Sequence, residues 1–515
     1  MKPNILSSFF FVLLTYFAAA LGVEAVVPAP DGGYPNFTTA EGTNALKNLS
    51  TGVANTATGW YSLFMTSTGS YNTGVGAGTL ALNNADSNTA IGTAALLLNN
   101  AGSGNTGVGV AALLNNTDGG ANTAIGDHAL ASNDITGNNL AVQNTAVGAQ
   151  ALSSNTDGPA NTAVGFQALF NNTIGGDNTA NGVSALQSNT TGSFNTANGA
   201  FALFENSTGA DNTANGNGAL TSNTTGFSNT ATGSLALDGN TTGHQNTANG
   251  TSALFNNTTG SINTATGERA LFSNTTGNGN TADGQNALAS NTTGSSCTAL
   301  GDGAGFNVST ANNVICIGAN VGGADTSNTC FIGNIFGATS SEGAAVFINS
   351  SGQLGTTTSS KRFKEEIKPM DQASEALFAF KPVTFRYKKE IDPDSISQFG
   401  LVAEDVEKVN PDLVVRDKEG NPYSVRYDQV NAMLLNEFLK EHRTVQKQEA
   451  TIALLKSTDA MQEAIITQLK TTDAKHEATI ANQQKQIEAL TAGLQKVSAQ
   501  LELRKPAPQT VENNR

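Results

Sequence analysis

The sequence predicts a mainly β protein, in which a parallel β-solenoid of 17-residue repeats precedes a small domain of ordinary composition and a long C-terminal coiled coil. Three observations predict this class. A five-residue motif returns every 17 residues from Asn55 to Gly301. Charged residues are scarce up to residue 358 and become frequent at Ser359. Near the C-terminus, apolar residues follow a seven-residue spacing, which is typical of coiled coils.

The first 25 residues are typical of a signal peptide. Lys2 precedes an apolar run from Ile5 to Leu21, and small residues would permit cleavage after Ala20 or Ala25. A membrane anchor is the alternative, but three hydroxyl residues interrupt the run and no basic flank follows it. We therefore expect an exported protein, at the cell surface or extracellular, with no stable membrane insertion after removal of the signal.

A repeated unit occupies most of the chain after this segment. It reads N-T-A-x-G-x-x-A-L-x-x-N-T-T-G-x-x, and its positions are numbered 1 to 17 below. The spacing is 17 residues except for one step of 16 and one of 22, where five residues are inserted between Ala131 and Gln143. Val314 to Gly318 resembles a decayed sixteenth copy. The pentads begin at Asn55, Asn72, Asn88, Asn105, Asn122, Asn144, Asn161, Asn178, Asn195, Asn212, Asn229, Asn246, Asn263, Asn280 and Cys297.

Such a short unit predicts a stack of coils in which each residue lies above its counterpart. Seventeen residues are too few for a helical hairpin, whereas two short strands and two turns fit. Leucine at position 9 is the large apolar residue common to the copies, so it should form a continuous core. The glycines at positions 5 and 15 should supply positive φ angles at the turns. We predict an N-terminal cap over 26–54, the rod over 55–335 and a linker over 336–358.

Position 4 divides the rod into two halves. It is aliphatic in copies two to seven, from Val75 to Val164, and polar in copies eight to fourteen, from Asn181 to Asp283. If the position faces inward, the second half contains an asparagine and threonine ladder; if it faces outward, the change is surface drift. The sequence leaves both interpretations open.

The repeats resemble the left-handed parallel β-roll of YadA-type trimeric adhesin heads, whose units also carry a short strand ending in Gly after an Asn. The resemblance covers roughly residues 50 to 335, although those heads use a shorter unit. It implies a homotrimer in which each roll packs on the next.

Several other functions fit the repeats less well. The Asn-x-Thr sequons could accept glycans, but their recurrence at a turn favours a structural origin. The glycine-rich run from Gly301 lacks the lysine of a phosphate-binding loop. Acidic residues are too few for calcium-binding rolls, and threonine ladders of ice-binding solenoids remain a minor alternative.

Charge and cysteine content exclude further classes. The first 358 residues carry 3 basic and 17 acidic residues, a net charge of −14, so nucleic acid is not an expected partner. The four histidines show no metal-ligand spacing, and we expect neither a metal nor a cofactor. The chain has three cysteines, an odd number, and they occupy different positions of the repeat: Cys297, Cys316 and Cys330. We therefore expect free, buried thiols.

At Ser359 the composition changes, and the sequence reads S-S-K-R-F-K-E-E-I. This resembles the intramolecular chaperone domain that ends phage tail fibres and endosialidase tailspikes, which opens with S-D-x-R-x-K-x-x-I. Ser359, Arg362, Lys364 and Ile367 match, while Ser360 replaces the usual Asp. Four further blocks of the family match in order: Phe385–Tyr387, Gly400–Glu407, Asn410–Val414 and Val425–Tyr427.

The resemblance implies a small α+β domain over 359–433 that trimerises, templates the folding of the preceding shaft and cuts itself off. The scissile bond would be Thr358–Ser359, with Ser359 as nucleophile and Lys364 as general base, in one turnover and without other substrates. A serine hydroxyl is a weak nucleophile unless a base removes its proton. Without the downstream blocks, a basic helix start on the surface would be the simpler interpretation, and a chaperone that never cuts remains open.

From Leu434 the sequence predicts a trimeric coiled coil over 434–505, followed by a flexible tail over 506–515. Eight of the ten positions in one heptad series are apolar. The series comprises Phe438, Val445, Ile452, Asp459, Ile466, Asp473, Ile480, Ile487, Leu494 and Leu501.

Together these features predict an exported, trimeric, adhesin-like fibre with itself as partner and an unidentified surface ligand. A phage-derived tail fibre is the alternative, which the signal peptide disfavours. A non-cleaving repeat protein and an enzyme that processes other proteins are further alternatives.

Overall fold

The computed structural model describes residues 35–338, 340 and 343–504, which divide into two compact units at residues 339 and 340. The predicted signal peptide over 1–25 and the predicted flexible tail over 506–515 lie outside the described residues. A short 3-10 turn, η1 (Pro35–Phe37), opens the described chain.

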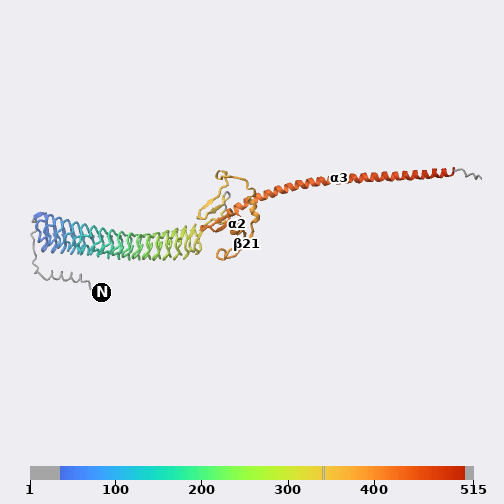
Figure 1. Ribbon diagram of the computed structural model, residues 1–515. Helices are drawn as coiled ribbons and strands as arrows, with labels where there is room; N and C mark the ends of the chain where they lie inside the picture. Colours follow the sequence, from blue (N-terminus) through green and yellow to red (C-terminus); the bar gives the residue numbers. More distant parts are fainter. Residues whose placement is uncertain (1–34, 339, 341–342, 505–515) are drawn as a thin grey trace, which may run out of the picture. The chain divides into compact units, whose positions relative to one another are not determined.

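The first unit is a parallel β-solenoid, as predicted, with its turns stacked side by side (Figure 1). Its strands form one sheet in which each strand pairs with the next in the chain, and repeat positions align. The strands are β1 (Thr39–Glu41), β2 (Thr56–Thr58), β3 (Thr73–Val75), β4 (Thr89–Ile91), β5 (Thr106–Val108), β6 (Thr123–Ile125), β7 (Thr145–Val147), β8 (Thr162–Val164), β9 (Thr179–Asn181), β10 (Thr196–Asn198), β11 (Thr213–Asn215), β12 (Thr230–Thr232), β13 (Thr247–Asn249), β14 (Thr264–Thr266), β15 (Thr281–Asp283), β16 (Thr298–Leu300), β17 (Val314–Ile317) and β18 (Thr329–Ile332).

Each turn contributes one strand, at positions 2 to 4, so the expectation of two strands per unit was wrong. A second strand does not form around position 9 because the leucine there adopts a positive φ angle, as at Leu203 (53°). A residue in that conformation cannot continue an extended segment. Turns are still hydrogen-bonded there, since the amide of Leu186 donates to the carbonyl of Ala202 at 2.9 Å. The solenoid also includes turns at β1 and at β17, the decayed copy.

The core of the solenoid is a column of leucines, as predicted. These side chains are buried throughout, and alanines at positions 3 and 8 pack beside them. Because each of these coils places one large apolar side chain in the core, a coil buries that side chain only by stacking on its neighbours. The leucines are Leu63, Leu80, Leu96, Leu113, Leu130, Leu152, Leu169, Leu186, Leu203, Leu220, Leu237, Leu254, Leu271 and Leu288.

Two columns of buried asparagines, at positions 1 and 12, flank this core. At position 12, Asn189 donates from Nδ2 to Oδ1 of Asn172 at 2.7 Å and to the carbonyl of Gly192 at 2.9 Å. Sequon asparagines at this position, such as Asn189, are fully buried. The structural origin of these sequons is therefore confirmed.

The two glycines of the unit have different roles. Glycines at position 5 adopt positive φ, such as Gly199 at 140°, as predicted. Glycines at position 15 do not, which corrects the prediction. A Cβ at Gly192 would lie 2.3 Å from the carbonyl oxygen of Gly209 in the next turn. Close approach of neighbouring turns, rather than backbone conformation, therefore requires glycine there.

Position 4 faces outward, which decides between the two interpretations left open. Val75, Ile91, Ile125 and Val164 expose 37 to 43% of their surface. The asparagine ladders therefore lie at positions 1 and 12, and the polar residues at position 4 belong to the surface.

The inserted and deleted residues fall in the same part of the turn. Nδ2 of Asn133 donates to the carbonyl of Ala141, eight residues on, whereas the distance in other turns is three residues. The five-residue insertion therefore lies within 134–140. In the 16-residue turn, Asn83 donates to Ala85, only two residues on.

The three cysteines are unpaired. Cys297 and Cys316 are buried as predicted, whereas Cys330 is exposed, which corrects the prediction for that residue. Cys330 occupies the second position of β18, where the side chain points out of the sheet. Burial raises the pKa of the Cys297 and Cys316 thiols.

The second unit contains three antiparallel two-stranded sheets, short helical segments and one long helix. The first hairpin lies in the segment predicted as a linker. The elements are β19 (Val346–Ile348), β20 (Leu354–Thr356), η2 (Lys361–Phe363), η3 (Asp371–Ala379), β21 (Val383–Phe385), β22 (Gln398–Gly400), α2 (Ala403–Val409), η4 (Pro411–Leu413), β23 (Val414–Arg416), β24 (Pro422–Val425) and α3 (Tyr427–Glu502).

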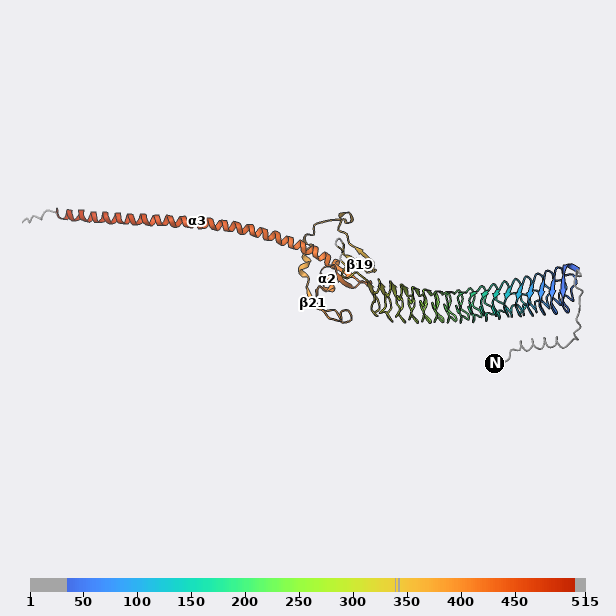
Figure 2. The ribbon, with the colours of Figure 1, turned by 180° about the vertical axis from the view of Figure 1, so that it is seen from behind.

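Helix α3 spans 76 residues without interruption (Figure 2). Its first turns contribute Val430 and Met433 to the core of the unit, and its heptad residues beyond them are exposed. The helix is confirmed, and its association into a coiled coil stays a prediction. None of the helices in the described residues has the length and apolar character needed to cross a membrane.

Candidate functional site

The predicted catalytic residues lie on either side of the turn η2. Ser360 precedes the turn in an extended conformation, and the amides of Phe363 and Lys364 donate to the carbonyls of Ser360 and Lys361, both at 3.1 Å. Ser359 therefore lies just before the turn and Lys364 just after it. The amide of Ser360 also donates to Oγ1 of Thr358 at 3.3 Å, which closes a short bend at the predicted scissile bond.

The turn does not bring the two predicted catalytic groups into contact. Within the described part of the chain, neither the hydroxyl of Ser359 nor the amine of Lys364 makes a hydrogen bond or ion pair, and both residues are exposed. A nucleophile and its base must lie within hydrogen-bond reach to react. The single chain therefore presents the residues of the predicted dyad without assembling them.

The two supporting residues of the opening motif are also on the surface. The guanidinium of Arg362 lies 4.6 Å from the centre of the Phe363 ring, a cation–π contact. Phe363 and Ile367 each expose 60% of their surface. The segment thus presents two large apolar side chains to solvent close to the predicted cut.

The downstream motif blocks form the folded part of the unit. The buried residues Val406, Leu413, Val414 and Val425 come from three of these blocks. The hydroxyl of Tyr427, in the last block, accepts the amide hydrogen of Leu401, in the second, at 3.0 Å. The blocks are therefore in contact with one another, which explains why they occur together in the sequence.

A polar cluster that the sequence did not reveal joins η3 to α3. Ser374 is fully buried, its hydroxyl donates to Glu437, and Nδ2 of Asn436 donates to that hydroxyl at 2.7 Å. Lys440 forms an ion pair with Glu437 at 2.8 Å, and the hydrogen bonds from Lys440 and Ser374 lower the pKa of Glu437. Ser374 is 62 or more residues away from its partners on α3, so no local pattern could have indicated the cluster.

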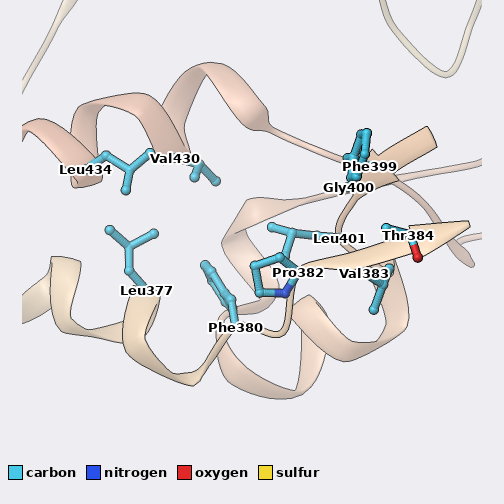
Figure 3. Close-up of a pocket in the computed structure, with 10 residues that line it drawn as sticks. All are labelled: Leu377, Phe380, Pro382, Val383, Thr384, Phe399, Gly400, Leu401, Val430 and Leu434. Atoms are coloured by element: carbon cyan, nitrogen blue, oxygen red, sulfur yellow. The ribbon is translucent and has the colours of Figure 1, made fainter. Parts of the chain in front are cut away.

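An open apolar groove lies between η3, the β21–β22 hairpin and the start of α3 (Figure 3). Leu377 and Phe380 face Val430 and Leu434 across it, as the sticks in Figure 3 show. Leu434 is the first residue of the predicted coiled coil and is 53% exposed. The groove is therefore continuous with the apolar surface of the helix.

Residues 359–415 match a family model described as the chaperone of endosialidase. Over these residues the chain is similar to that chaperone. The match begins at Ser359, the residue at which the composition changes, and covers 57 of the 515 residues. In this chain the chaperone domain follows a solenoid of about 17 turns, a combination that fits a tail-fibre-like protein.

No curated protein and no solved structure matches the chain. The resemblance of the repeats to YadA-type heads, with the handedness and the trimer that it implies, therefore stays a prediction. In the described residues, no group of three or more histidine, cysteine or acidic side chains is arranged to hold a metal ion.

Proposed function

We propose that the chain is the subunit of an exported, homotrimeric, adhesin-like fibre whose chaperone domain directs assembly and then cuts the Thr358–Ser359 bond. The observation that carries the proposal is the position of the chaperone domain, which begins at Ser359 on the C-terminal side of the β-solenoid. The mature fibre would consist of the solenoid fragment. The chaperone domain would cut only its own chain, and only once.

The proposed cut follows from the chemistry of the two residues. Oγ of Ser359 attacks the carbonyl carbon of Thr358, while the neutral amine of Lys364 accepts the hydroxyl proton. The bond between that carbon and the Ser359 nitrogen breaks, and the nitrogen takes up the proton to leave as an amine. Water then hydrolyses the resulting ester, which leaves a carboxylate on Thr358 and a free hydroxyl on Ser359.

Assembly would provide what the single chain lacks. A lysine serves as a base more readily in a desolvated site, whereas Lys364 is exposed in one chain. The exposed side chains of Phe363 and Ile367 and the apolar groove give neighbouring copies surfaces to cover. Covering these surfaces would exclude water from the junction and restrict η2, so that cutting follows trimerisation.

Expression of single-residue variants tests the cut. The wild-type chain should give two bands on a denaturing gel, and Ser359→Ala and Lys364→Ala should each give one full-length band. Ser360→Ala and Lys361→Ala are matched controls that should still be cut, because they change the neighbouring hydroxyl and amine. A single band from the wild type, or two bands from Ser359→Ala, would contradict the proposal.

A phage tail fibre is the second candidate, because the family description refers to an endosialidase chaperone and the domain follows a β-solenoid. The two candidates differ in whether the first 25 residues are removed by a signal peptidase. Sequencing of the N-terminus of the mature protein from its natural source decides between them. A terminus at Leu21 or Val26 supports export, whereas retention of residues 1–25 supports cytoplasmic assembly of a phage fibre.

A further inference from the structure

We propose that the outward face of the solenoid sheet is the surface through which copies of the chain pack, with the aliphatic column over β3 to β8 at the centre. This face, called the sheet face below, consists of positions 2 and 4 in strands β2 to β14. The inference rests on the proposed homotrimer and identifies the part of the solenoid that would form its interface.

The first argument is an exposed apolar column. Six consecutive strands place an aliphatic side chain at position 4, and threonine lies beside it at position 2. An exposed apolar surface of this length on a soluble rod indicates an interaction site. The six residues are Val75, Ile91, Val108, Ile125, Val147 and Val164, of which Val108 and Val147 are half-buried and the others exposed.

The second argument is that this column is unbroken. Position 4 of each strand pairs with position 4 of the next, as Ile91 pairs with Val108 and Val108 with Ile125. Insertions and deletions in the turns do not disturb it, since Ile125 still pairs with Val147 across the inserted segment. Strands lie about 4.8 Å apart in such sheets. Two copies side by side could therefore match turn for turn.

The third argument is charge. The sheet face carries no charged residue from β2 to β14, although the first 358 residues have a net charge of −14. The acidic residues of these turns lie at other positions, for example Asp127 at position 6 and Glu205 at position 11, and acidic residues reach position 4 only outside this range, at Glu41 in β1 and Asp283 in β15. Equal charges that meet across an interface repel each other. The uncharged face is therefore where two such rods can approach.

The polar half of the face is consistent with the same partner. In β9 to β14, position 4 is asparagine or threonine, and Nδ2 of Asn198 donates to Oδ1 of Asn215 along the column at 2.9 Å. Uncharged amides and hydroxyls can both donate and accept, so identical residues can bind one another across copies. Between copies, the aliphatic half would form an apolar contact that excludes water, and the polar half would form hydrogen bonds.

A second copy, rather than an unrelated ligand, is the occupant that fits the rest of the chain. Helix α3 also exposes an unpartnered apolar series, with Ile452 and Ile466 about half exposed. Heptad positions of this kind are covered by identical helices in a coiled coil. The two units of the chain thus each present a regular, repeating face that another copy of the same unit would cover.

Cysteine cross-linking of the full-length chain tests the assignment. If the aliphatic column lies next to the axis of the assembly, as proposed, position 125 of one copy lies near position 125 of its neighbours, where a disulfide requires Cα atoms within about 7 Å. Ile125→Cys and Val108→Cys, each introduced into the uncut Ser359→Ala chain, should therefore give a band of twice the chain mass under mild oxidation. Ile174→Cys is the matched control, because Ile174 is an exposed isoleucine at position 14, outside the sheet face. The Ser359→Ala chain without an added cysteine measures any background from Cys330.

The outcomes separate the two proposals. Cross-linking at 108 and 125 but not at 174 supports the sheet face as the interface. An oligomer in sedimentation that does not cross-link at 108 or 125, or cross-links equally at 174, overturns the sheet face and leaves the trimer in place. A monomer in sedimentation overturns the proposed homotrimer itself.

Discussion

The side-chain oxygen of Asn161 accepts two hydrogen bonds from Asn178, one turn later: from its backbone amide at 3.0 Å and from its Nδ2 at 3.1 Å. Nδ2 of Asn178 also donates to the carbonyl of Gly192 at 2.9 Å. The oxygen of a position-1 asparagine thus accepts a backbone amide of the next turn, and the Nδ2 group donates to a backbone carbonyl. This pattern repeats along the column. This accounts for asparagine at position 1, since a shorter or apolar residue would leave the backbone amide of the next turn unpaired in the core.

Replacement of one column asparagine should therefore destabilise the solenoid. Asn195→Ala leaves the amide of Asn212 without its side-chain acceptor and removes one of the two donors to the carbonyl of Gly209, the other being Asn206. A buried polar group left unpaired costs about 1–3 kcal/mol. Asn198→Ala, three residues away on the surface, should cost far less. Chemical unfolding of both variants checks this, and equal losses of stability would contradict the structural role of position 1.

The sequence predicts the solenoid well because its repeats align every structural position with a copy of itself. The leucine column and position-5 glycines follow from recurrence alone. The single strand per turn does not, because nothing in the residue type shows that Leu203 adopts positive φ. The direction of position 4 was likewise undecidable from the sequence, since aliphatic and polar residues both occur there.

The thiols should differ in reactivity. Burial raises the pKa of Cys297 and Cys316, which lowers the fraction of reactive thiolate, whereas Cys330 is exposed. A thiol reagent at neutral pH should modify one equivalent per folded chain and three after unfolding. Cys330→Ser should abolish the rapid modification of the folded chain. Two or more fast equivalents in the wild type would show that the last turns are open.

The final turns of the solenoid should loosen in acid. The carboxylate of Asp325 accepts the amides of Ser309, Thr310 and Ala311 at 2.8 to 2.9 Å, and these bonds lower its pKa. Because the folded-state pKa is below the unfolded value of about 4, this stabilisation is complete above pH 4 and declines as the pH falls below it.

Hydrogen exchange of the peptide around residues 309–311, relative to an interior solenoid peptide at the same pH, measures this effect. Exchange should be roughly several-fold faster in Asp325→Ala at pH 7, since hydrogen bonds to charged groups are among the stronger ones. The wild type should approach the variant as the pH falls. Asp302→Ala, another acidic residue near this end, is the control. An unchanged exchange rate in Asp325→Ala would rule out the proposed stabilisation.

Association through α3 can be tested on its apolar series. In a Ser359→Ala chain, which keeps the units joined, Ile466→Lys with Ile480→Lys should dissociate the assembly at concentrations where the parent remains assembled, because charges would enter the helix interface. The control is Gln468→Lys with Asn482→Lys, which adds the same two charges two residues after Ile466 and Ile480, outside the apolar series. Sedimentation equilibrium compares them, and equal association of both double variants would argue against a coiled coil.

The candidate site was predicted only as a set of residues. The match at 359–415 starts at the predicted nucleophile, so the boundary could be found from the motif. The geometry could not, because Ser359 and Lys364 are exposed and unpaired in one chain. The cluster of Ser374 with Glu437 was also beyond reach, since its members become neighbours only when η3 packs on α3.

The mass of the products of the freshly purified chain tests the central claim most directly. Intact mass spectrometry should detect a C-terminal fragment of 157 residues that begins at Ser359, together with a solenoid fragment that ends at Thr358. A single uncut chain, or a fragment that begins at any other residue, would contradict the proposal that the chaperone domain releases itself at this bond.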